Sequence, residues 1–290
     1  MRHLRSAAPL LHVIAAVLAA ALVLALAACA EVRRERGRAE AERIAAAAGM
    51  AAQLVAADPF TLLSYRRIAP GRGGRLVVYF EGDGLAWINR GQISDNPTPG
   101  DPLALRLAAA DDAPSVLYLA RPCQFVMGGD ARNCAPKYWS EARFSEEVVA
   151  ASSHAVDTAM AAAGARELEL VGYSGGGVLA TLVAARRGDV ARVITIAANL
   201  DVAFWTAYHK VSPLSQSLDP AQFPAALAEV RQIAFVGGRD EVVPPAVIDH
   251  YRAALPAKAP LTILPQAEFS HDCCWVEAWP ALLKEARALP

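Results

Sequence analysis

Short apolar runs alternate with longer amphipathic stretches over most of this 290-residue chain. The runs are rich in β-branched and aromatic residues, which is typical of buried strands, and they cover residues 75–80, 115–120, 167–171, 190–196, 232–236 and 261–264. The stretches between them keep apolar residues at helical spacing and predict helices over residues 141–163, 176–187, 245–255 and 274–288. This alternation predicts βαβ units in an α/β fold, with a mostly parallel central sheet flanked by helices.

Three further segments complete the expected organisation. Residues 60–67 predict a strand at an antiparallel edge, with residues 70–74 as its turn. Residues 199–222 fit neither period and predict a small cap or lid insertion. Residues 38–57 are rich in Ala, Glu and Arg and predict a helical spacer, so the folded domain is expected to span residues 58–290.

The start of the chain has the organisation of an export signal. Two arginines precede a charge-free apolar run over residues 13–28. The run ends in Leu-Ala-Ala-Cys at Cys29, which resembles the lipobox of bacterial lipoproteins, where the signal is cut before an acylated cysteine. We therefore expect residues 1–28 to be a signal peptide, Cys29 to be the lipidation site, and residues 29–57 to form a tether.

The alternative for this segment is an uncleaved anchor helix. Four arginines between residues 33 and 38 favour it, because positive charge beyond an apolar run resists translocation. Either arrangement places the rest of the chain outside the inner membrane. Ala30 stands where lipoproteins retained at the inner membrane usually carry aspartate. By that resemblance we expect a lipid-anchored protein of the cell envelope, on the outer membrane facing the periplasm, with inner-membrane anchoring as the alternative.

Composition and charge exclude several classes of protein. The 28 Lys and Arg residues balance 29 Asp and Glu residues, so the chain lacks the basic field of a nucleic-acid-binding protein. Hydrophobic residues make up 54% of the chain, which excludes disorder of the whole protein. A single long uncharged run excludes a membrane protein with several spans.

Five cysteines are present, and lipidation of Cys29 would leave four in a compartment that permits disulfides. Cys123 and Cys134 bracket a glycine-containing loop of ten residues, and we favour this pair as a disulfide. Cys273 and Cys274 are adjacent and could bond to each other, stay reduced or pair with the first two. Because no C-x-x-C spacing occurs, a metal site is not expected.

The clearest chemical signal follows the strand expected at residues 167–171. The chain there reads Gly172-Tyr173-Ser174-Gly175-Gly176, a G-x-S-x-G motif placed before a helix of small residues. A tight strand-to-helix turn strains its central residue, and flanking glycines remove clashing Cβ atoms. The helix N-terminus supplies amide donors beside a developing oxyanion. The motif in this context predicts that Ser174 is a nucleophile.

From about residue 60 to its end, the chain resembles the α/β-hydrolase superfamily, whose triad follows the chain order Ser, Asp, His. Residues 237–244 resemble the G-x-x-D-x-x-V-P turn of that superfamily, so Asp240 matches the triad acid. His271 follows the last expected strand and matches the triad base. The resemblance implies that His271 takes the proton of Ser174 while Asp240 orients the imidazole.

Other acids and histidines remain as alternatives. Asp201 also follows a strand and is the main rival acid, while Glu241 and Asp272 are weaker candidates. The histidines on helices or in the cap are expected to pack or to lie at the surface: His154, His209 and His250.

The loop after residues 75–80 reads Glu81-Gly82-Asp83-Gly84 and resembles the His-Gly-x-Gly loop of the superfamily, with glutamate where histidine is usual. The resemblance implies an oxyanion hole made by the N–H of Gly175 and the N–H of Asp83, with Gly84 as the alternative donor. An ordinary glycine turn is the competing interpretation.

The segment over residues 120–125 adds a narrower resemblance. Together with the loop after residue 80, it is similar to a group of exported proteobacterial hydrolases, which adds no substrate. Trp87, Trp139 and Trp205 could wall an apolar pocket or simply pack.

The leading hypothesis is a membrane-tethered serine hydrolase without cofactor that cleaves carboxylic esters or thioesters of small-molecule or lipid-like substrates. Within enzymes, the alternative is a serine peptidase of the aminopeptidase or dipeptidyl type, for which Glu81 could hold a free amine. A different class is an inactive envelope binding protein with a hydrolase fold.

Overall fold

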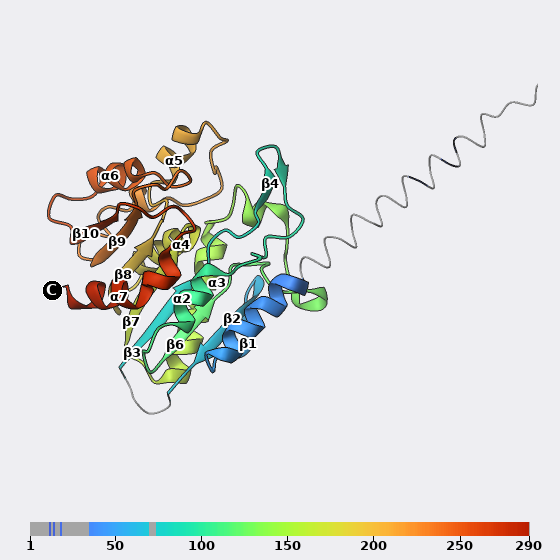
Figure 1. Cartoon of the computed structure of the whole chain (residues 1–290), viewed down its shortest axis with the longest axis horizontal. Helices are drawn as coiled ribbons and strands as arrows, with labels where there is room; N and C mark the ends of the chain where they lie inside the picture. Colours follow the sequence, from blue (N-terminus) through green and yellow to red (C-terminus); the bar gives the residue numbers. More distant parts are fainter. Residues whose placement is uncertain (1–11, 13, 15–17, 19–34, 70–73, 290) are drawn as a thin grey trace, which may run out of the picture.

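An eight-stranded sheet forms the centre of the protein in our computed structural model, which describes residues 12, 14, 18, 35–69 and 74–289. The strand order is β1-β2-β6-β3-β7-β8-β9-β10 (Figure 1). Six of these strands pair in parallel: β3 (Arg75–Phe80), β6 (Val116–Leu119), β7 (Glu167–Tyr173), β8 (Val190–Ile196), β9 (Gln232–Gly237) and β10 (Leu261–Gln266). The predicted strands and the mostly parallel sheet are confirmed.

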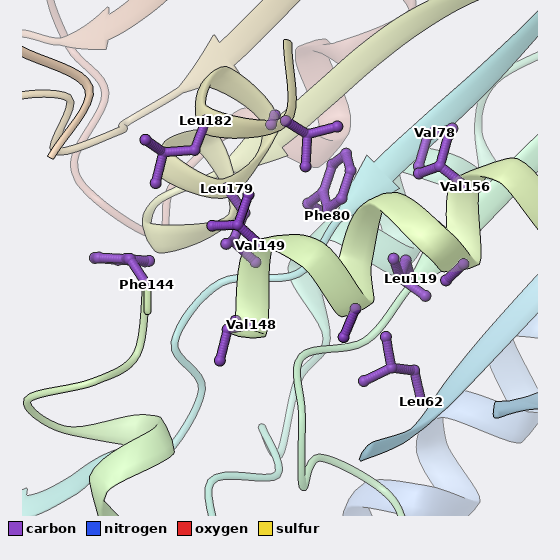
Figure 2. Packing of buried hydrophobic residues seen from close by; sticks show 14 of the residues in the cluster. Leu62, Val78, Phe80, Leu119, Phe144, Val148, Val149, Val156, Leu179 and Leu182 are labelled. Atoms are coloured by element: carbon purple, nitrogen blue, oxygen red, sulfur yellow. The ribbon is translucent and has the colours of Figure 1, made fainter. Parts of the chain in front are cut away.

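Helices cover both faces of this sheet. One face packs against α3 (Glu146–Ala163), α4 (Gly175–Ala184) and α6 (Pro245–Ala254), and the other against α2 (Leu103–Ala109), α7 (Trp275–Ala288) and a helix over residues 35–47. Figure 2 shows the first face, where Leu62, Phe80 and Leu119 of the strands contact apolar residues of α3 and α4. Burial of both sheet faces explains why the parallel strands read as continuous apolar runs.

The start of α3 differs from the prediction. The helix begins at Glu146, whereas residues 141–144 form turns that follow a short 3₁₀ helix over Pro136–Trp139. In these turns the Arg143 side chain points inward, where it pairs with Asp83, and its carbonyl oxygen accepts a hydrogen bond from Arg121. The residues expected to form the first turn of α3 therefore make polar contacts with the loop after β3 instead.

The first edge of the sheet also differs from the prediction. β1 (Ala51–Ala57) pairs antiparallel with β2 (Phe60–Arg67) along its whole length, so residues 51–57 form a strand instead of a helical spacer. The hairpin turns at residues 58–59 and not at residues 70–74, since β2 pairs next with β6. Val55 and Ala57 are buried while Leu54 and Ala56 are exposed, and this alternating burial favours a strand over a helix.

The helix over residues 35–47 packs into the core. Ala41, Ile44 and Ala45 are buried against α2 and the adjacent strands, so core packing begins before the boundary expected at residue 58. Cys29 and nearly all of the expected signal peptide lie outside the described residues. Within the described part of the chain, no helix has both the length and the apolar character needed to span a bilayer.

Two small elements stand above the carboxyl ends of the parallel strands. One is a hairpin of β4 (Trp87–Asn89) and β5 (Gln92–Ile93), which follows β3. The other is α5 (Val202–His209), which lies in the segment expected to form a cap and follows β8. Both project at the top of the molecule in Figure 1.

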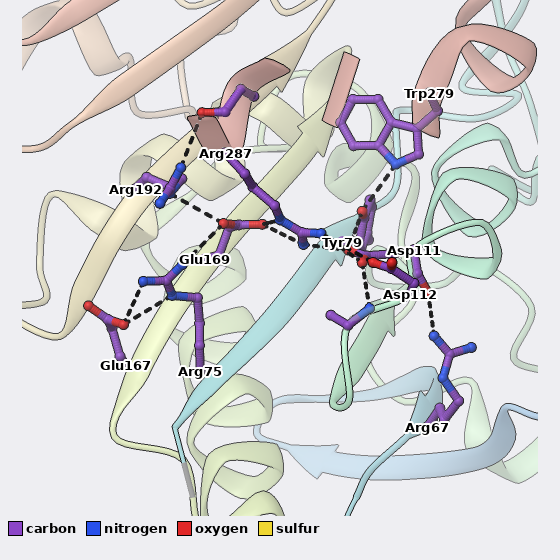
Figure 3. Close-up of polar contacts among 12 residues, drawn as sticks. Arg67, Arg75, Tyr79, Asp111, Asp112, Glu167, Glu169, Arg192, Trp279 and Arg287 are labelled. Carbon is purple, nitrogen blue, oxygen red and sulfur yellow. Dashed lines mark hydrogen bonds and ion pairs between the residues drawn. The ribbon is translucent and has the colours of Figure 1, made fainter. Parts of the chain in front are cut away.

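A buried ion network joins the sheet to the last helix (Figure 3). Glu169 of β7 is fully buried, and its carboxylate lies 2.7 Å from Arg287, 3.3 Å from Arg192 and 3.7 Å from Arg75. Arg287 also donates to both carboxylate oxygens of Asp111, at 3.0 and 2.8 Å. Glu169 therefore balances several cations that would otherwise repel one another.

Glu169→Gln should lower the free energy of unfolding by about 3 kcal/mol, because it leaves the buried Arg192 and the partly buried Arg287 without their shared anion. The matched control is Glu167→Gln on the same strand. Glu167 pairs with Arg75 at 2.8 Å but is half exposed, so its loss should cost less than about 1 kcal/mol. Urea unfolding of both variants measures the difference, and equal losses would contradict the assignment.

Candidate active site

The turn between β7 and α4 holds Ser174 in an unusual backbone conformation. Its φ of 52° and ψ of −124° are rare for a residue with a side chain. The neighbouring glycines leave no room for a Cβ: one added to Gly172 would lie 2.3 Å from the oxygen of Gly176, and one added to Gly176 would lie 2.2 Å from the oxygen of Phe80. The glycines of the motif thus permit a turn that lifts the Ser174 side chain to the end of the sheet.

Two later loops bring an imidazole and a carboxylate to this serine. His271 Nε2 lies 3.1 Å from Ser174 Oγ, and His271 Nδ1 lies 2.8 Å from Asp240 Oδ2. The second oxygen of Asp240 accepts the N–H groups of Val242 and Val243 at 2.8 and 2.7 Å. Asp240 is buried, so these bonds hold its carboxylate in one orientation. The structure therefore brings the three residues together in a continuous hydrogen-bonded chain.

The rival acids make other contacts. Asp201 caps α5 by accepting the N–H of Phe204 at 2.8 Å, and its other oxygen lies 2.5 Å from His250 Nδ1. Asp272 accepts a hydrogen bond from the Tyr173 hydroxyl at 3.0 Å, and burial first, then Asp272, raise the pKa of that phenol. Glu241 is exposed.

The other histidines lie away from Ser174. His209 on α5 contacts the carbonyl of Val242 at 2.9 Å, and His250 stacks on Phe204 with ring centroids 4.3 Å apart. His154 is exposed on α3. His271 is thus the histidine that the structure places beside the serine.

The loop after β3 lies against the N-terminus of α4. Asp83 and Gly84 line the same cavity as Ser174, and Gly175 is the first residue of α4. The Asp83 carboxylate approaches so closely that a Cβ on Gly175 would lie 2.0 Å from its oxygen. Gly84 has a φ of +63°, which favours glycine. The three expected oxyanion-hole residues are therefore close to the candidate nucleophile.

An ion cluster that the sequence reasoning missed holds this loop. The Asp83 carboxylate pairs with Arg121 at 2.9 Å and also with Arg143, whose guanidinium donates to Ser140 O at 2.8 Å. Burial alone would raise the pKa of Asp83, but Arg143 and Arg121 outweigh burial and hold it below its usual value. The loop is therefore tied to the segments that follow β6. Both arginines lie in or near motifs noted in the sequence, but no spacing rule links them to Asp83.

Both disulfides lie near the candidate site. Cys123 is bonded to Cys134, as predicted, in the segment that directly follows Arg121. Cys273 is bonded to Cys274, which is one of the arrangements left open by the sequence, and this pair follows His271 after one residue. Each disulfide thus lies in a segment of the chain that also carries residues of the site. Among the described residues, no group of three metal-ligating side chains is positioned to hold a metal ion.

Glu81 is buried behind the same loop. Its Oε1 accepts the N–H of Gly82 at 2.8 Å and that of Ala104 at 3.4 Å, and its Oε2 accepts the hydroxyl of Tyr118 at 3.0 Å. Burial raises the pKa of Glu81 to about 7, and these hydrogen bonds only partly oppose the rise. Its oxygens are committed to the protein, which weakens the suggestion that Glu81 holds a substrate amine.

A cavity of about 640 Å³ opens beside Ser174 and His271. Trp87 and Trp205 line it, together with Leu85, Leu103 and Val242, whereas Trp139 packs in the core and donates to Ser94 O at 2.8 Å. Asn199, which the sequence analysis did not single out, also lines the cavity, and its Oδ1 has no hydrogen-bond partner among the described residues. The cavity therefore combines apolar walls with polar lining residues such as Asp101 and Arg143.

Comparisons with known proteins place this geometry in a familiar fold. No protein-family profile and no curated protein matches the sequence. Among solved structures, Est1E from Butyrivibrio proteoclasticus is similar at 12% identity, with a TM-score of 0.55, over 82% of this chain and 99% of that chain. An esterase of Pyrococcus furiosus is similar at 9% identity and a TM-score of 0.57, over 82% and 91% of the two chains. An acylaminoacyl peptidase is similar at 9% identity and a TM-score of 0.60, over 82% of this chain but 41% of that chain.

These identities are low, so the comparisons establish the fold alone. The chain has the α/β-hydrolase fold, and its structural neighbours are serine hydrolases, among them esterases and a peptidase. The role of each site residue is therefore argued from its geometry.

The raised pKa of Glu81 predicts a pH-dependent stability. Between pH 4.5, the ordinary pKa, and about 7, the folded protein keeps a proton that the unfolded chain has lost. Stability should therefore fall as pH rises through this window, by up to about 1.4 kcal/mol per pH unit. Glu81→Gln should remove this component, which urea unfolding between pH 5 and 8 measures. Exposed Glu268→Gln is the control, and parallel profiles for wild type and Glu81→Gln would contradict the prediction.

Proposed function

We propose that the protein is a serine hydrolase that cleaves carboxylic esters or thioesters through an acyl-enzyme on Ser174. One observation carries the proposal: Ser174, His271 and Asp240 form a continuous chain of hydrogen bonds at the edge of a cavity. A serine hydroxyl is a weak nucleophile unless a base takes its proton, and a neutral imidazole suits that task near neutral pH.

The reaction would proceed in two transfers. His271 Nε2 takes the proton from Ser174 Oγ, at 3.1 Å, as the oxygen attacks the substrate carbonyl carbon. The protonated imidazole, stabilised by Asp240, then gives its proton to the departing alcohol or thiol. Water, activated by the same imidazole, attacks the acyl-enzyme and releases the acid, which restores the Ser174 hydroxyl.

In this mechanism, the N–H groups of Gly175 and Asp83 stabilise the oxyanion, with Gly84 as the alternative to Asp83. Arg121 and Arg143 act as positioning residues, because their guanidinium groups bind the Asp83 side chain. Their two ion pairs keep the loop against α4, so that its amides need not reorganise as charge develops.

The cavity supports esters over peptides. Its apolar walls of Trp87, Trp205, Leu85 and Leu103 suit an acyl or aromatic group. Glu81, the residue suggested to hold a peptide amine, already binds Gly82, Ala104 and Tyr118. Of the three neighbours described above, the Pyrococcus furiosus protein is an esterase, whereas the match covers only 41% of the peptidase.

We further propose that the protein works in the cell envelope on a lipid anchor at Cys29. The sequence around Cys29 supports this location, and the described residues follow it after a short interval. An anchored enzyme would meet lipid-like esters at high local concentration.

Labelling with a fluorophosphonate probe tests the nucleophile. The probe should form an adduct on Ser174, located by mass spectrometry, and Ser174→Ala should abolish both labelling and ester hydrolysis. Absence of labelling in the folded wild-type protein would favour the inactive binding protein. Hydrolysis that survives in Ser174→Ala would contradict the assignment.

A pair of aspartate variants tests the acid. Asp240→Asn should lower kcat about 10⁴-fold, because the amide favours the wrong imidazole tautomer. Asp201→Asn is the matched control, since Asp201 is also buried and also contacts a histidine. It should reduce stability by less than about 1 kcal/mol, because asparagine can still cap α5 and the lost ion pair involves the half-exposed His250, and kcat should stay within a few-fold of wild type. The opposite ranking of kcat would identify Asp201 as the acid.

A further inference from the structure

The exposed large apolar side chains gather around the mouth of the active-site cavity. Among the described residues beyond residue 18, six large apolar side chains are exposed. One is Leu54, and the other five are Trp87, Ile88, Tyr208, Val211 and Val242. These five side chains are between 38% and 51% exposed. They lie on or next to the β4–β5 hairpin, α5 and the loop after β9. Only Leu54, on the edge strand β1, lies in a different element. We call these five residues the apolar rim.

Two residues of the rim lie in the wall of the cavity itself. Trp87 and Val242 line it from opposite segments. Trp205 of α5 also lines it, and its Nε1 donates to Val242 O at 2.7 Å, which joins α5 to the loop after β9. The β4–β5 hairpin forms a separate projection, and Figure 1 shows it on the same side of the molecule as α5.

Basic side chains accompany the apolar ones. Arg90 lies at the tip of the β4–β5 hairpin, and Lys210 follows the last residue of α5. Both are exposed, and neither has an ion-pair partner among the described residues. Aromatic and aliphatic groups flanked by lysine or arginine suit the boundary between acyl chains and anionic head groups.

The chain also enters the domain near this mouth. Gly37 lies so close to Pro99 that an added Cβ would be 2.8 Å from the Pro99 carbonyl oxygen, and Pro99 lines the cavity. Arg38 donates to the carbonyl of Phe125 at 3.3 Å, which fixes the start of the helix there. Cys29 precedes Gly37 by eight positions, which span about 30 Å at most. An anchor at Cys29 would therefore hold the cavity side of the domain close to the bilayer.

We propose that the apolar rim docks on a lipid bilayer, so that the active-site cavity opens directly onto the membrane. The orientation rests on the proposed anchor at Cys29. Docking itself does not depend on the proposed hydrolase activity. If both proposals hold, the ester substrate enters the cavity from the lipid phase. Exposed apolar side chains around an opening mark an interaction surface, and the tether selects the membrane as its occupant.

Tryptophan fluorescence tests the docking without using catalysis. The full chain carrying Ser174→Ala is reconstituted in phosphatidylcholine vesicles that contain phosphatidylglycerol and lipids with brominated acyl chains. Of the five tryptophans, Trp139, Trp275 and Trp279 are buried, so quenching by bromine reports chiefly on Trp87 and Trp205. We expect strong quenching that Trp87→Phe largely removes.

Aqueous iodide provides the complementary measurement. Docking predicts that vesicles protect Trp87 from iodide while exposing it to the brominated lipids. The proposal is overturned if iodide quenches Trp87 equally with and without vesicles and brominated lipids have no effect. Because the chain lacks Ser174, this outcome leaves the hydrolase proposal untouched.

A kinetic comparison separates docking from chemistry. Ile88→Ser combined with Tyr208→Ser should leave hydrolysis of a short water-soluble ester unchanged, because neither residue lines the cavity. The same variant should lose about tenfold in kcat/KM for an ester embedded in vesicles, since less apolar area would be buried at the interface. Leu54→Ser removes an apolar group that is 40% exposed on β1 and should change neither rate. Equal losses in Leu54→Ser, or equal losses on both substrates, would overturn the proposal.

Discussion

The backbone between β7 and α4 passes so close to β3 that no side chain fits between them. Gly172 lies against the oxygen of Gly176, and Gly176 lies against the carbonyl of Phe80, the last residue of β3. This close packing holds Ser174 at a positive φ and sets the point where the chain leaves β3. The loop with Asp83 starts immediately after Phe80, so one steric contact positions both the candidate nucleophile and the candidate oxyanion hole.

Ion pairs and hydrogen bonds then fix the loop after β3 and the Asp240 side chain, which backbone packing alone does not hold in place. The loop after β3 would be a glycine-rich segment with much conformational freedom, but two arginines from beyond β6 bind the carboxylate of Asp83. Glu81 adds hydrogen bonds from inside the protein. Asp240 is held in the same way, by two backbone amides. At each position, hydrogen bonds or ion pairs with fixed partners decide where the carboxylate points.

Much of this arrangement could be predicted from the sequence, and the failures have physical causes. The parallel strands are buried on both faces and read as apolar runs, while Ser174, Asp240 and His271 sit in turns whose spacing to a strand is nearly fixed. β1 was missed because its alanines and glutamine suit a helix as well, and only pairing with β2 decides its state. Arg121 and Arg143 were missed because their partner Asp83 is distant in the chain, and no periodicity reports such a contact.

The order of strands has a mechanical consequence for a protein held at its N-terminus. A pull along the chain would reach the helix over residues 35–47 first and then β1, at the outer edge of the sheet. Ser174, Asp240 and His271 follow β7, β9 and β10, and β2, β6 and β3 separate β1 from the first of these strands. Drag on the domain would therefore load the outer hairpin before it disturbed the arrangement of these three residues. With the proposed anchor at Cys29, the outer strands would act as a buffer between membrane motion and these three residues.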